Sequence, residues 1–451
     1  MARKTTKNEK LTPEEKLVQA LVPEAEQPYR VPENWKWVRL GTLGYTNIGL
    51  TYKPSDKSDE GTIVLRSCNI LDGRMVYDDI VKVSIDVPEN KMSKKGDILI
   101  CARNGSKSLV GKTAIIDDDG MSYGAFMAIF RSPYNKYVYY YLNSHYFRGI
   151  IDRDVGTTTI NQVTQQIIKE LPFPFAPLAE QKRIVDRIES LFSRLDEAKE
   201  KAQAVVDGFE DRKAAILHKA FTGELTAEWR ERNGYSIAQW ESALLKDCSY
   251  LIGDGLHGTP IFDKYGQYYF INGNNFSDTR IEIKPDTKTI ALGEYEKYKL
   301  ALFPDLTVFV SINGTLGRTA FYNGEPVILG KSACYVNVNE RLNKYFLRYF
   351  FTSKEFIDYA NSMATGSTIK NLGLKAMRNL ILNLPSVSEQ VEIVQILDRI
   401  MDAEQQAKSA AEQVISQIDT MKKAILARAF RGELGTNDPT EESAEGILSV
   451  K

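Results

Sequence analysis

Two glycine-rich stretches of this chain contain the residue types that bind phosphate groups in nucleotide-dependent proteins. Residues 253–258 match the pattern Gly-x-Gly-x-x-Gly of dinucleotide-binding folds. That pattern binds a dinucleotide only where a helix follows it, because the helix N-terminus holds the pyrophosphate. Here Thr259 and Pro260 come next, and no helical pattern begins. We therefore predict no dinucleotide site at residues 253–258.

The second kind of stretch resembles the phosphate-binding loop of nucleoside triphosphatases. Residues 105–113 and 324–332 each run from a glycine to Gly-Lys-Thr or Gly-Lys-Ser, with five residues between the glycines. The phosphate-binding loop requires four such residues and a following helix, whereas strand-like sequence follows here. The sequence also contains no GxSxG, no HExxH and no adenine-methyltransferase motif. We expect no ATP site and no catalysis by this chain.

The composition limits metal, disulfide and membrane chemistry. Three histidines and no CxxC spacing leave little for a metal site. No apolar run reaches the ~18 residues that cross a bilayer, so we expect a cytoplasmic protein with reduced thiols. The net charge of −1 argues weakly against a nucleic-acid binder that acts alone. It does not exclude a DNA-reading subunit whose partners supply further phosphate contacts.

The strongest feature of the sequence is an internal repeat. Glu180-Gln181 recurs as Glu389-Gln390, and Ala220-Phe221 recurs as Ala429-Phe430, at one constant shift of 209 positions (389 − 180 and 429 − 220). Each copy is a long segment of helical pattern. Because the shift is constant, the two helices align without a gap, and the molecule has two equivalent halves.

Apolar residues in both helices follow a 4-3-4-3 spacing with charges between them, which is typical of a coiled coil. Ser386 and Glu389 predict a capping box at the start of the second helix, and Gly223 and Gly432 end the two helices. One alternative is that each apolar seam packs on its own globule or dimerises the protein. The other is that the two helices pair antiparallel within the chain and form a spacer. The residues expected at the seams are Ile184, Ile188, Leu191, Leu195, Ile393, Leu397, Ile400 and Val414.

Two β-rich globules precede the helices and also repeat each other. Trp35 corresponds to Trp240, and Asn104-Gly105 corresponds to Asn313-Gly314, but the sequence between such positions diverges. One scaffold with two sets of loops suits two binding specificities. We expect an α+β fold with the following segments: an N-terminal extension (1–30), a first globule (31–175), a central helix (176–222), a linker (223–237), a second globule (238–385), a distal helix (386–431) and a C-terminal tail (432–451).

The combination of two diverged globules with two copies of one long helix closely resembles the specificity subunits of type I restriction-modification systems. The resemblance covers about residues 31 to 434. It is carried by the start of each helix, which is Pro174-Phe-Ala-Pro-Leu-Ala-Glu180-Gln181 in the first copy and Leu384-Pro-Ser-Val-Ser-Glu389-Gln390 in the second. The ending Ala-Phe-x-Gly-Glu-Leu, present twice, and the segment Val31-Pro-Glu-Asn-Trp35-Lys-Trp-Val-Arg-Leu40 carry it further.

The resemblance implies a non-catalytic subunit for DNA recognition. Each globule would be a target recognition domain that reads one half of a split double-stranded DNA sequence. The helices would be antiparallel coiled-coil spacers that bind two methyltransferase (M) subunits, and restriction (R) subunits would complete the assembly. S-adenosylmethionine would bind the M subunits, and ATP and magnesium would serve the R subunits. The resemblance implies no cofactor, metal or membrane for this chain.

The loops that read DNA should present hydrogen-bonding groups to bases and cations to phosphates. Residues 87–113 hold six Lys or Arg against two Asp or Glu. An ordinary solvated hairpin is the alternative for this loop, and turn formation is the alternative for the asparagine cluster of the second globule. The candidate DNA-binding residues are Arg103, Asn104, Gly105, Ser106, Lys107, Ser108 and Lys112 in the first globule, and His257, Thr259, Asn272, Asn274, Asn275, Asn313, Thr315 and Arg318 in the second.

Two short stretches, 156–159 and 366–368, could contact phosphate or merely cap a turn. Two rival functions also remain. The chain could be a coiled-coil scaffold that bridges two partner copies without reading DNA. It could also be a specificity subunit of a phage-defence system that lacks a type I nuclease.

Overall fold

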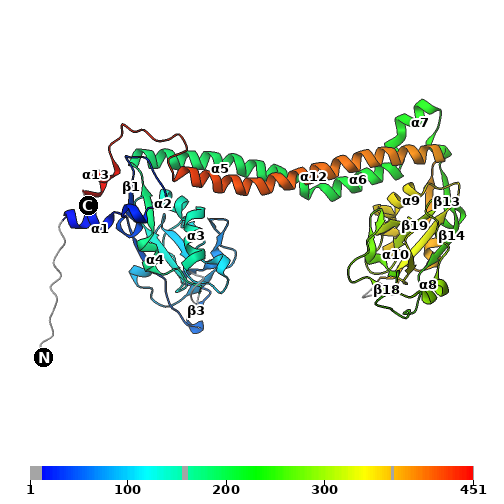
Figure 1. Cartoon of the computed structure of the whole chain (residues 1–451), viewed down its shortest axis with the longest axis horizontal. Coiled ribbons are helices and arrows are strands. Elements are labelled where there is room, and N and C mark those ends of the chain that lie inside the picture. The colour runs from blue at the N-terminus through cyan, green and yellow to red at the C-terminus, as the bar shows by residue number, and fades with distance from the viewer. Residues whose placement is uncertain (1–12, 155–160, 367–369, 450–451) are drawn as a thin grey trace. The chain divides into compact units, whose positions relative to one another are not determined.

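Figure 1 shows a computed structural model of the chain, which describes residues 13–154, 161–366 and 370–449. The chain forms two compact units. Unit 1 contains residues 1–201 and 414–451, and unit 2 contains residues 202–413. Each unit therefore includes a globule and parts of both long helices. Among the helices of the described ranges, none is both long enough and apolar enough to cross a bilayer.

Unit 1 holds two four-stranded sheets and a terminal two-stranded sheet. One sheet is antiparallel in the order β2-β11-β8-β9 (Tyr45–Ile48, Met127–Arg131, Ile98–Cys101, Thr113–Ile115). The other has the order β10-β4-β7-β3 (Ser122–Tyr123, Thr62–Leu65, Val81–Val83, Lys57–Ser58). The terminal sheet pairs β1 (Lys36–Arg39) with β12 (Pro172–Phe175), and β5 (Ile70–Leu71) pairs with β6 (Arg74–Met75). Its helices are α1 (Pro13–Ala20), α2 (Asn135–Leu142), α3 (His145–Asp154), α4 (Gln165–Glu170) and α13 (Ala444–Ser449).

Unit 2 repeats this arrangement. The antiparallel sheet has the order β14-β22-β19-β20 (Ser249–Asp254, Ala333–Val338, Thr307–Ser311, Thr319–Phe321), and the second sheet has the order β18-β15-β21 (Lys288–Ile290, Tyr268–Ile271, Val327–Leu329). Two pairs complete it: β13 with β23 (Glu241–Leu244, Ile381–Leu384) and β16 with β17 (Phe276–Ser277, Arg280–Ile281). Its helices are α6 (Phe209–Phe221), α7 (Ala227–Asn233), α8 (Leu292–Tyr298), α9 (Lys344–Phe351), α10 (Lys354–Met363) and α11 (Leu374–Arg378).

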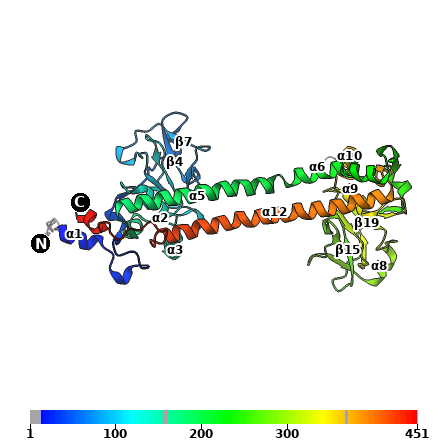
Figure 2. The same ribbon diagram turned by 90° about the horizontal axis from the view of Figure 1, so that it is seen from above.

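The long helices are α5 (Leu178–Asp207) and α12 (Val387–Ala429). In unit 1 they lie side by side (Figure 2), where Lys199 pairs with Asp419 at 3.3 Å and Asp196 pairs with Lys422. In unit 2, Arg212 of α6 pairs with Glu404 at 2.8 Å. From Asp196 to Lys199 along α5, the partner residues on α12 run in the opposite direction, from Lys422 to Asp419. The helices therefore pair antiparallel there.

The C-terminal end of α12 completes the core of unit 1. Ala429 and Phe430 are buried there beside Ile184 and Ile188 of α5. The Phe430 ring centroid lies 5.1 Å from that of Tyr137. The Tyr137 hydroxyl donates to the Pro174 carbonyl at 3.0 Å, so this buried tyrosine packs α2 against β12.

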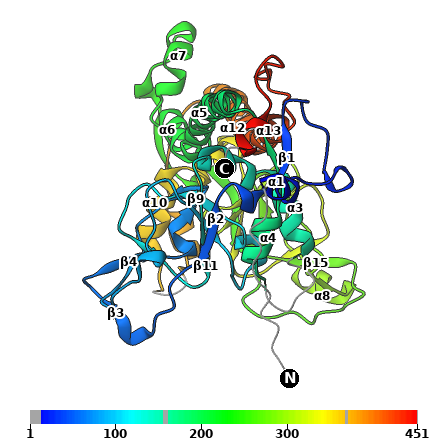
Figure 3. The same ribbon diagram turned by 90° about the vertical axis from the view of Figure 1, so that its left-hand side faces the viewer.

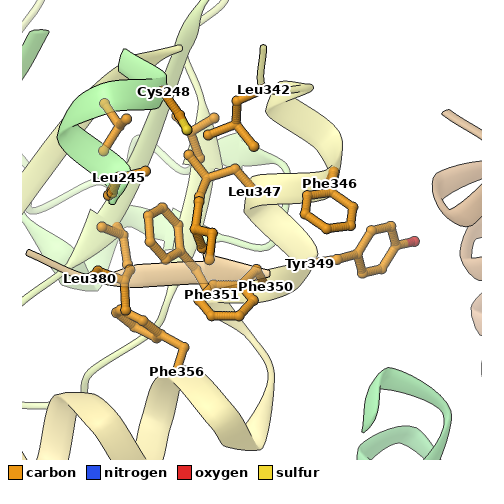
Figure 4. Packing of buried hydrophobic residues seen from close by; sticks show 14 of the residues in the cluster. Leu245, Cys248, Leu342, Phe346, Leu347, Tyr349, Phe350, Phe351, Phe356 and Leu380 are labelled. Carbon is orange, nitrogen blue, oxygen red and sulfur yellow. The ribbon is translucent and has the colours of Figure 1, made fainter. Parts of the chain in front are cut away.

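Unit 2 is completed in the same way by the end of α6. Ala220 and Phe221 are buried with Ile393 and Leu397 of α12, and the Phe221 ring centroid lies 5.3 Å from that of Phe346. Figure 4 shows the side chains of α9 that gather at this cluster with Leu245, Cys248 and Leu380. Each Ala-Phe pair therefore recurs in the sequence because it fills the core of a globule.

The remaining seam residues are less enclosed. Leu191, Leu195 and Ile400 are half-buried, and Val414 is 40% exposed. The first turns of both helices thus pack on globules, as one alternative required, while the later turns carry the ion pairs between helices. Gly223 and Gly432 follow α6 and α12 with φ angles of 84° and 74°, the left-handed conformation that glycine adopts freely at a helix end.

A buried carboxylate explains why Trp and Glu-Gln recur. In unit 1 the Trp35 indole N–H donates to Glu180 Oε2 at 2.7 Å, and in unit 2 the Trp240 indole N–H donates to Glu389 Oε2 at 3.0 Å. The adjacent glutamine Gln181 donates to the Ala176 carbonyl at 2.7 Å. These bonds fix the first turn of each long helix to the first strand of its globule.

The two carboxylates differ in their other partners. Glu389 forms a buried ion pair with Arg230 of α7 at 2.5 Å. Glu180 instead accepts from the neutral amide of Asn437 at 2.7 Å, and burial raises the pKa of Glu180. The capping box predicted at Ser386 is corrected in part. The Ser386 hydroxyl does accept from the Glu389 N–H at 3.3 Å, but among the described residues the Glu389 carboxylate bonds to Trp240, Thr226 and Arg230 instead.

The described parts of the terminal segments, 13–30 and 432–449, and the segment between the repeats are structured. The Val22 N–H donates to the Trp37 carbonyl at 2.9 Å, which attaches the N-terminal segment to β1. Figure 3 shows α13 beside α1, and Glu445 of α13 pairs with Lys36 of β1 at 2.9 Å. The segment expected to be a linker, 223–237, contains α7 and the buried Arg230.

We predict that Glu389→Gln lowers the free energy of unfolding of unit 2 by about 3 kcal/mol, because it leaves the Arg230 guanidinium buried without a carboxylate. Glu180→Gln is the matched control and should cost unit 1 only about 1 kcal/mol, since its partners are neutral donors. Hydrogen exchange in increasing urea, followed in peptides from each unit, measures both changes. Equal losses in the two variants would contradict the role of Arg230.

Candidate nucleic-acid interface

A cleft of about 1150 Å³ opens in unit 1 between the ends of strands from both four-stranded sheets. Four loops form it: residues 50–54 after β2, 66–68 after β4, 103–105 after β8 and 124–127 between β10 and β11. Asn161 closes one side. Segments far apart in the sequence thus meet at one site.

Close approach of two backbones holds the loops together. The Leu50 N–H donates to the Tyr123 carbonyl at 2.6 Å, and the Gly124 N–H donates to the Leu65 carbonyl at 2.9 Å. A Cβ atom on Gly49 would lie 2.2 Å from the Gly124 oxygen, which no side chain tolerates. Glycine is therefore required where the β2 loop meets the β10–β11 turn.

The loop after β8 is fixed from two sides. The Asn104 amide donates to the Ser67 hydroxyl at 3.2 Å, and the Asn161 amide donates to the Gly105 carbonyl at 3.1 Å. The N–H groups of Ala102 and Arg103 both donate to the Phe126 carbonyl, at 3.0 and 2.9 Å. The loop is held in place although its side chains reach solvent.

The cleft carries more positive than negative charge. Lys57, Arg66 and Arg103 line it, against Asp79 as its acidic residue. Arg66 pairs with Asp79 at 2.7 Å, and the Arg66 Nε atom is buried without a hydrogen-bond partner among the described residues. This excess of cations, with amide and hydroxyl groups beside it, suits an anionic ligand that also presents hydrogen-bonding edges.

Three of the seven residues predicted in unit 1 line this cleft: Arg103, Asn104 and Gly105. The hydroxyls of Ser106 and Ser108 bond each other at 2.8 Å, and the Lys107 ammonium donates to the Asp152 carbonyl of α3 at 2.9 Å. Lys112 is half-buried and lies outside the lining. Of the two short stretches that could contact phosphate or cap a turn, 156–159 lies outside the described residues, and so do residues 367 and 368 of 366–368.

Sequence reasoning missed the cleft residues that other loops supply. Tyr52, Lys57, Arg66 and Phe126 belong to four separate segments, and none forms a motif with Arg103. The one available signal was the repeat of glycines at 49 and 255, which marks the framework and not the ligand-facing positions.

Unit 2 has the same framework. The Leu256 N–H donates to the Leu329 carbonyl at 2.7 Å, and a Cβ atom on Gly255 would lie 2.3 Å from the Gly330 oxygen. Gly255 thus repeats the role of Gly49. This close approach explains Gly255, the second glycine of the Gly-x-Gly-x-x-Gly pattern. The phosphate-loop resemblance ends in strands, β9 and β22, as predicted.

Asn69 and Asn275 occupy equivalent positions in the two units. Asn69 accepts from the Arg66 N–H at 2.8 Å, and Asn275 accepts from the Asn272 N–H at 3.0 Å. Asn275 also donates to the Glu282 carbonyl at 3.0 Å and is buried. Its side chain forms a turn, which was the alternative to DNA contact.

This alignment places the other predicted residues of unit 2. His257, Asn272, Asn274 and Asn313 stand where Thr51, Arg66, Cys68 and Arg103 line the cleft of unit 1. Asn313 bridges Asn371 as Arg103 bridges Gln162, so the sequence match of Asn104 with Asn313 is wrong by one residue. His257 Nε2 lies 2.6 Å from Asp254 Oδ2, and the Asn272 side chain accepts from the Asn274 N–H at 2.9 Å. Thr259, Thr315 and Arg318 are exposed.

Metal coordination finds no support in the described ranges, where no group of three or more His, Cys, Asp or Glu side chains is placed to hold an ion. Burial raises the pKa of Cys101 to about 11 and raises the pKa values of Cys248 and Cys334. Cys68 is exposed in the cleft.

We predict one fast-reacting thiol per chain at pH 8, because three thiols are buried and protonated there while Cys68 is accessible. Titration with a chromogenic disulfide measures the number, and the fast phase should disappear in Cys68→Ser. A second thiol reacting at the same rate would show that a buried cysteine is exposed in solution.

Comparison with known proteins places the chain in a family. The model of the type I restriction modification DNA specificity domain matches residues 32–206 and 240–414. The chain is 26% identical over 430 residues to the type I restriction enzyme StySPI specificity subunit of Salmonella potsdam, and covers 90% of both chains. It is 24% identical over 425 residues to the EcoKI specificity subunit of Escherichia coli K12, again covering 90% of both.

Solved structures share the fold. The HsdS subunit from Thermoanaerobacter tengcongensis superposes with a TM-score of 0.61 at 19% identity, over 91% of this chain and 100% of that chain. A chain from a structural study of the assembly and conformational transition of a type I system gives 0.67 at 19% identity, over 90% and 100%. Because the two matched domains span more than half of the sequence, the chain belongs to the family of type I restriction-modification specificity subunits.

Proposed function

We propose that each unit reads one half of a bipartite double-stranded DNA target through the loops that surround its cleft framework. The observation that carries this proposal is one backbone framework with two sets of outward residues. Gly49 and Gly255 hold equivalent loops in place, whereas Arg66 is replaced by Asn272 and Arg103 by Asn313 at equivalent positions. Two sets of donors and acceptors on one scaffold suit two different base sequences.

The basic lining of the unit 1 cleft supports DNA as the ligand, because cations position a protein on phosphates while amides and guanidinium groups read base edges. As a specificity subunit, the chain contributes recognition and no catalysis. The chemistry would belong to partners: S-adenosylmethionine to the M subunits, and ATP and magnesium to the R subunits. The assembly would act in the cytoplasm.

The helices would set the distance between the half-sites and bind two M subunits. Apolar side chains remain exposed on both long helices, which suits a protein partner: Leu178, Val387, Val391, Val414 and Met421 are 38–49% exposed. The seam positions Val414 and Ile400 belong to α12 and are available in part for such contacts.

The alternative is a scaffold that bridges two partner copies and reads no DNA. It would use the same helices but gives no reason for a basic cleft, or for a framework whose outward residues differ between the units. A shift assay of the chain with its M partner on random bipartite duplexes discriminates between the two. Recovery of no preferred sequence would favour the scaffold.

A domain exchange tests whether each unit reads its half of the target independently. Replacing residues 31–175 with the corresponding domain of another specificity subunit should change one half of the methylated motif and leave the other half as before. Sequencing of methylated motifs in cells that also contain the M partner measures this. A change in both halves, or in neither, would contradict independent readout by the two units.

A length change tests the spacer. One heptad inserted into both helices, after residue 201 and after residue 413, preserves the contacts within each unit. At ~1.5 Å per residue the helices lengthen by about 10 Å, so the unread gap should grow by about three base pairs. Both half-sites should stay the same, and an altered half-site would argue against the helices as the ruler.

A further inference from the structure

Phe126 is an exposed apolar side chain at the cleft of unit 1. It is 59% exposed and lines the cleft together with Arg103. The Arg103 guanidinium carbon lies 5.2 Å from the centroid of the Phe126 ring. A ring in contact with a cation, on a basic surface, is an unusual place to leave so much apolar area in water.

The backbone fixes these two side chains relative to each other. The Phe126 carbonyl accepts from both the Ala102 and Arg103 N–H groups, and the Met127 N–H donates to the Gly124 carbonyl at 2.8 Å, which closes the turn that carries Phe126. The ring and the guanidinium group are therefore presented as one unit from two loops, and little conformational freedom is lost when a ligand binds them.

The Arg103 guanidinium group keeps its donors available. It makes no side-chain hydrogen bond to any residue in the described ranges, and its contact with Phe126 is through a ring. Because a cation–π contact uses the face of the guanidinium plane, the N–H groups at its edge remain free to donate.

Unit 2 shows that the framework does not require this pair. The Ile312 N–H donates to the Ser332 carbonyl at 3.0 Å, as the Ala102 N–H donates to the Phe126 carbonyl, so Asn313 stands at the position of Arg103 and Ser332 at that of Phe126. Asn313 provides an amide in place of the guanidinium group, and Ser332 provides a hydroxyl in place of the ring. The ring and the cation are therefore particular to unit 1 and are not needed to build the fold.

We propose that Phe126 and Arg103 together read a thymine next to a guanine in the half-site of unit 1. Phe126 has no donor or acceptor, and the C5 methyl group of thymine is the apolar group that a base pair presents in the major groove. Arg103 donates to N7 and O6 of the guanine beside it, which is the commonest specific contact of arginine with DNA. This inference rests on the proposed function.

Modified bases test each contact in the complex of the full chain with its M partner. Replacing the thymine by deoxyuridine removes the methyl group and should weaken binding about fourfold. Replacing the guanine by 7-deazaguanine removes the N7 acceptor and should weaken binding about tenfold. These substrates test the unaltered chain, so the result does not depend on the folding of a variant.

Variants then assign each effect to its residue. Phe126→Ala should bind thymine and deoxyuridine duplexes equally, and Arg103→Ala should bind guanine and 7-deazaguanine duplexes equally. Tyr45 and Arg131 form a matched control, because Arg131 lies 5.3 Å from the exposed Tyr45 ring at a site outside the cleft lining. Tyr45→Ala should retain both effects of the modified bases.

Three outcomes overturn the inference. A first half-site without a thymine beside a guanine excludes the proposed contact. Unchanged sensitivity to deoxyuridine in Phe126→Ala shows that the ring does not contact the methyl group. An equal loss of binding to all sequences in that variant indicates a wedge between bases or a contact with a protein partner. If the unaltered chain gives no bipartite motif at all, the proposed function itself fails, which is a distinct result.

Discussion

Each unit depends on a helix end that is buried in a hydrophobic core formed mainly by other segments of the chain. In unit 1, Phe430 from the end of α12 is 1% exposed and lies against the tyrosines of α2. In unit 2, Phe221 from the end of α6 lies against Phe346 and Phe350 of α9. A buried phenylalanine side chain contributes about 1.5–3 kcal/mol by transfer from water, and its loss also leaves a cavity.

Neither globule therefore has a complete core without helical residues from both copies of the repeat, which α5 and α12 supply in unit 1 and α6 and α12 supply in unit 2. Each copy of the repeated helix must keep, at both of its ends, the residues that pack on a globule. This requirement explains why the spacing between those residues is the same in both copies. The buried carboxylates Glu180 and Glu389 add a second constraint, because each joins the first turn of a helix to the tryptophan just before the adjoining strand. The loops at the cleft carry no such constraint, so they are free to differ.

Much of this architecture could be predicted from sequence because periodic and repeated features are local or recur. The long helices, their glycine ends and the two β-rich globules follow from apolar spacing, turn residues and the matched Trp and Glu-Gln positions. The glycine pattern at 253–258 could be rejected as a nucleotide site from its neighbours alone. The reason for its second glycine, the approach of Gly255 to the Gly330 carbonyl, could be found only in the fold.

The candidate site could be predicted from the sequence only in part. Arg103 and Asn104 stand out because they form a polar, glycine-containing loop between two strands. Phe126 could not be found in this way, since it is a single aromatic residue in a turn and meets Arg103 only through the pairing of β8 with β11. The partners of Glu389 were missed for a similar reason. Local sequence suggests a capping box, whereas Arg230 reaches the carboxylate from a helix in the segment expected to be a linker.

On the proposed function, the charge distribution accounts for a division of work between this chain and its partners. Phosphate contacts add affinity for every DNA sequence alike, while base contacts separate one sequence from another. A chain with a net charge of −1 gains little from long-range attraction to DNA. Three of its cationic groups line a cleft whose loops also present amides and an aromatic ring. On the proposed function, non-specific attraction would be left to other subunits, and the fit of these few residues to the bases would determine where the assembly binds.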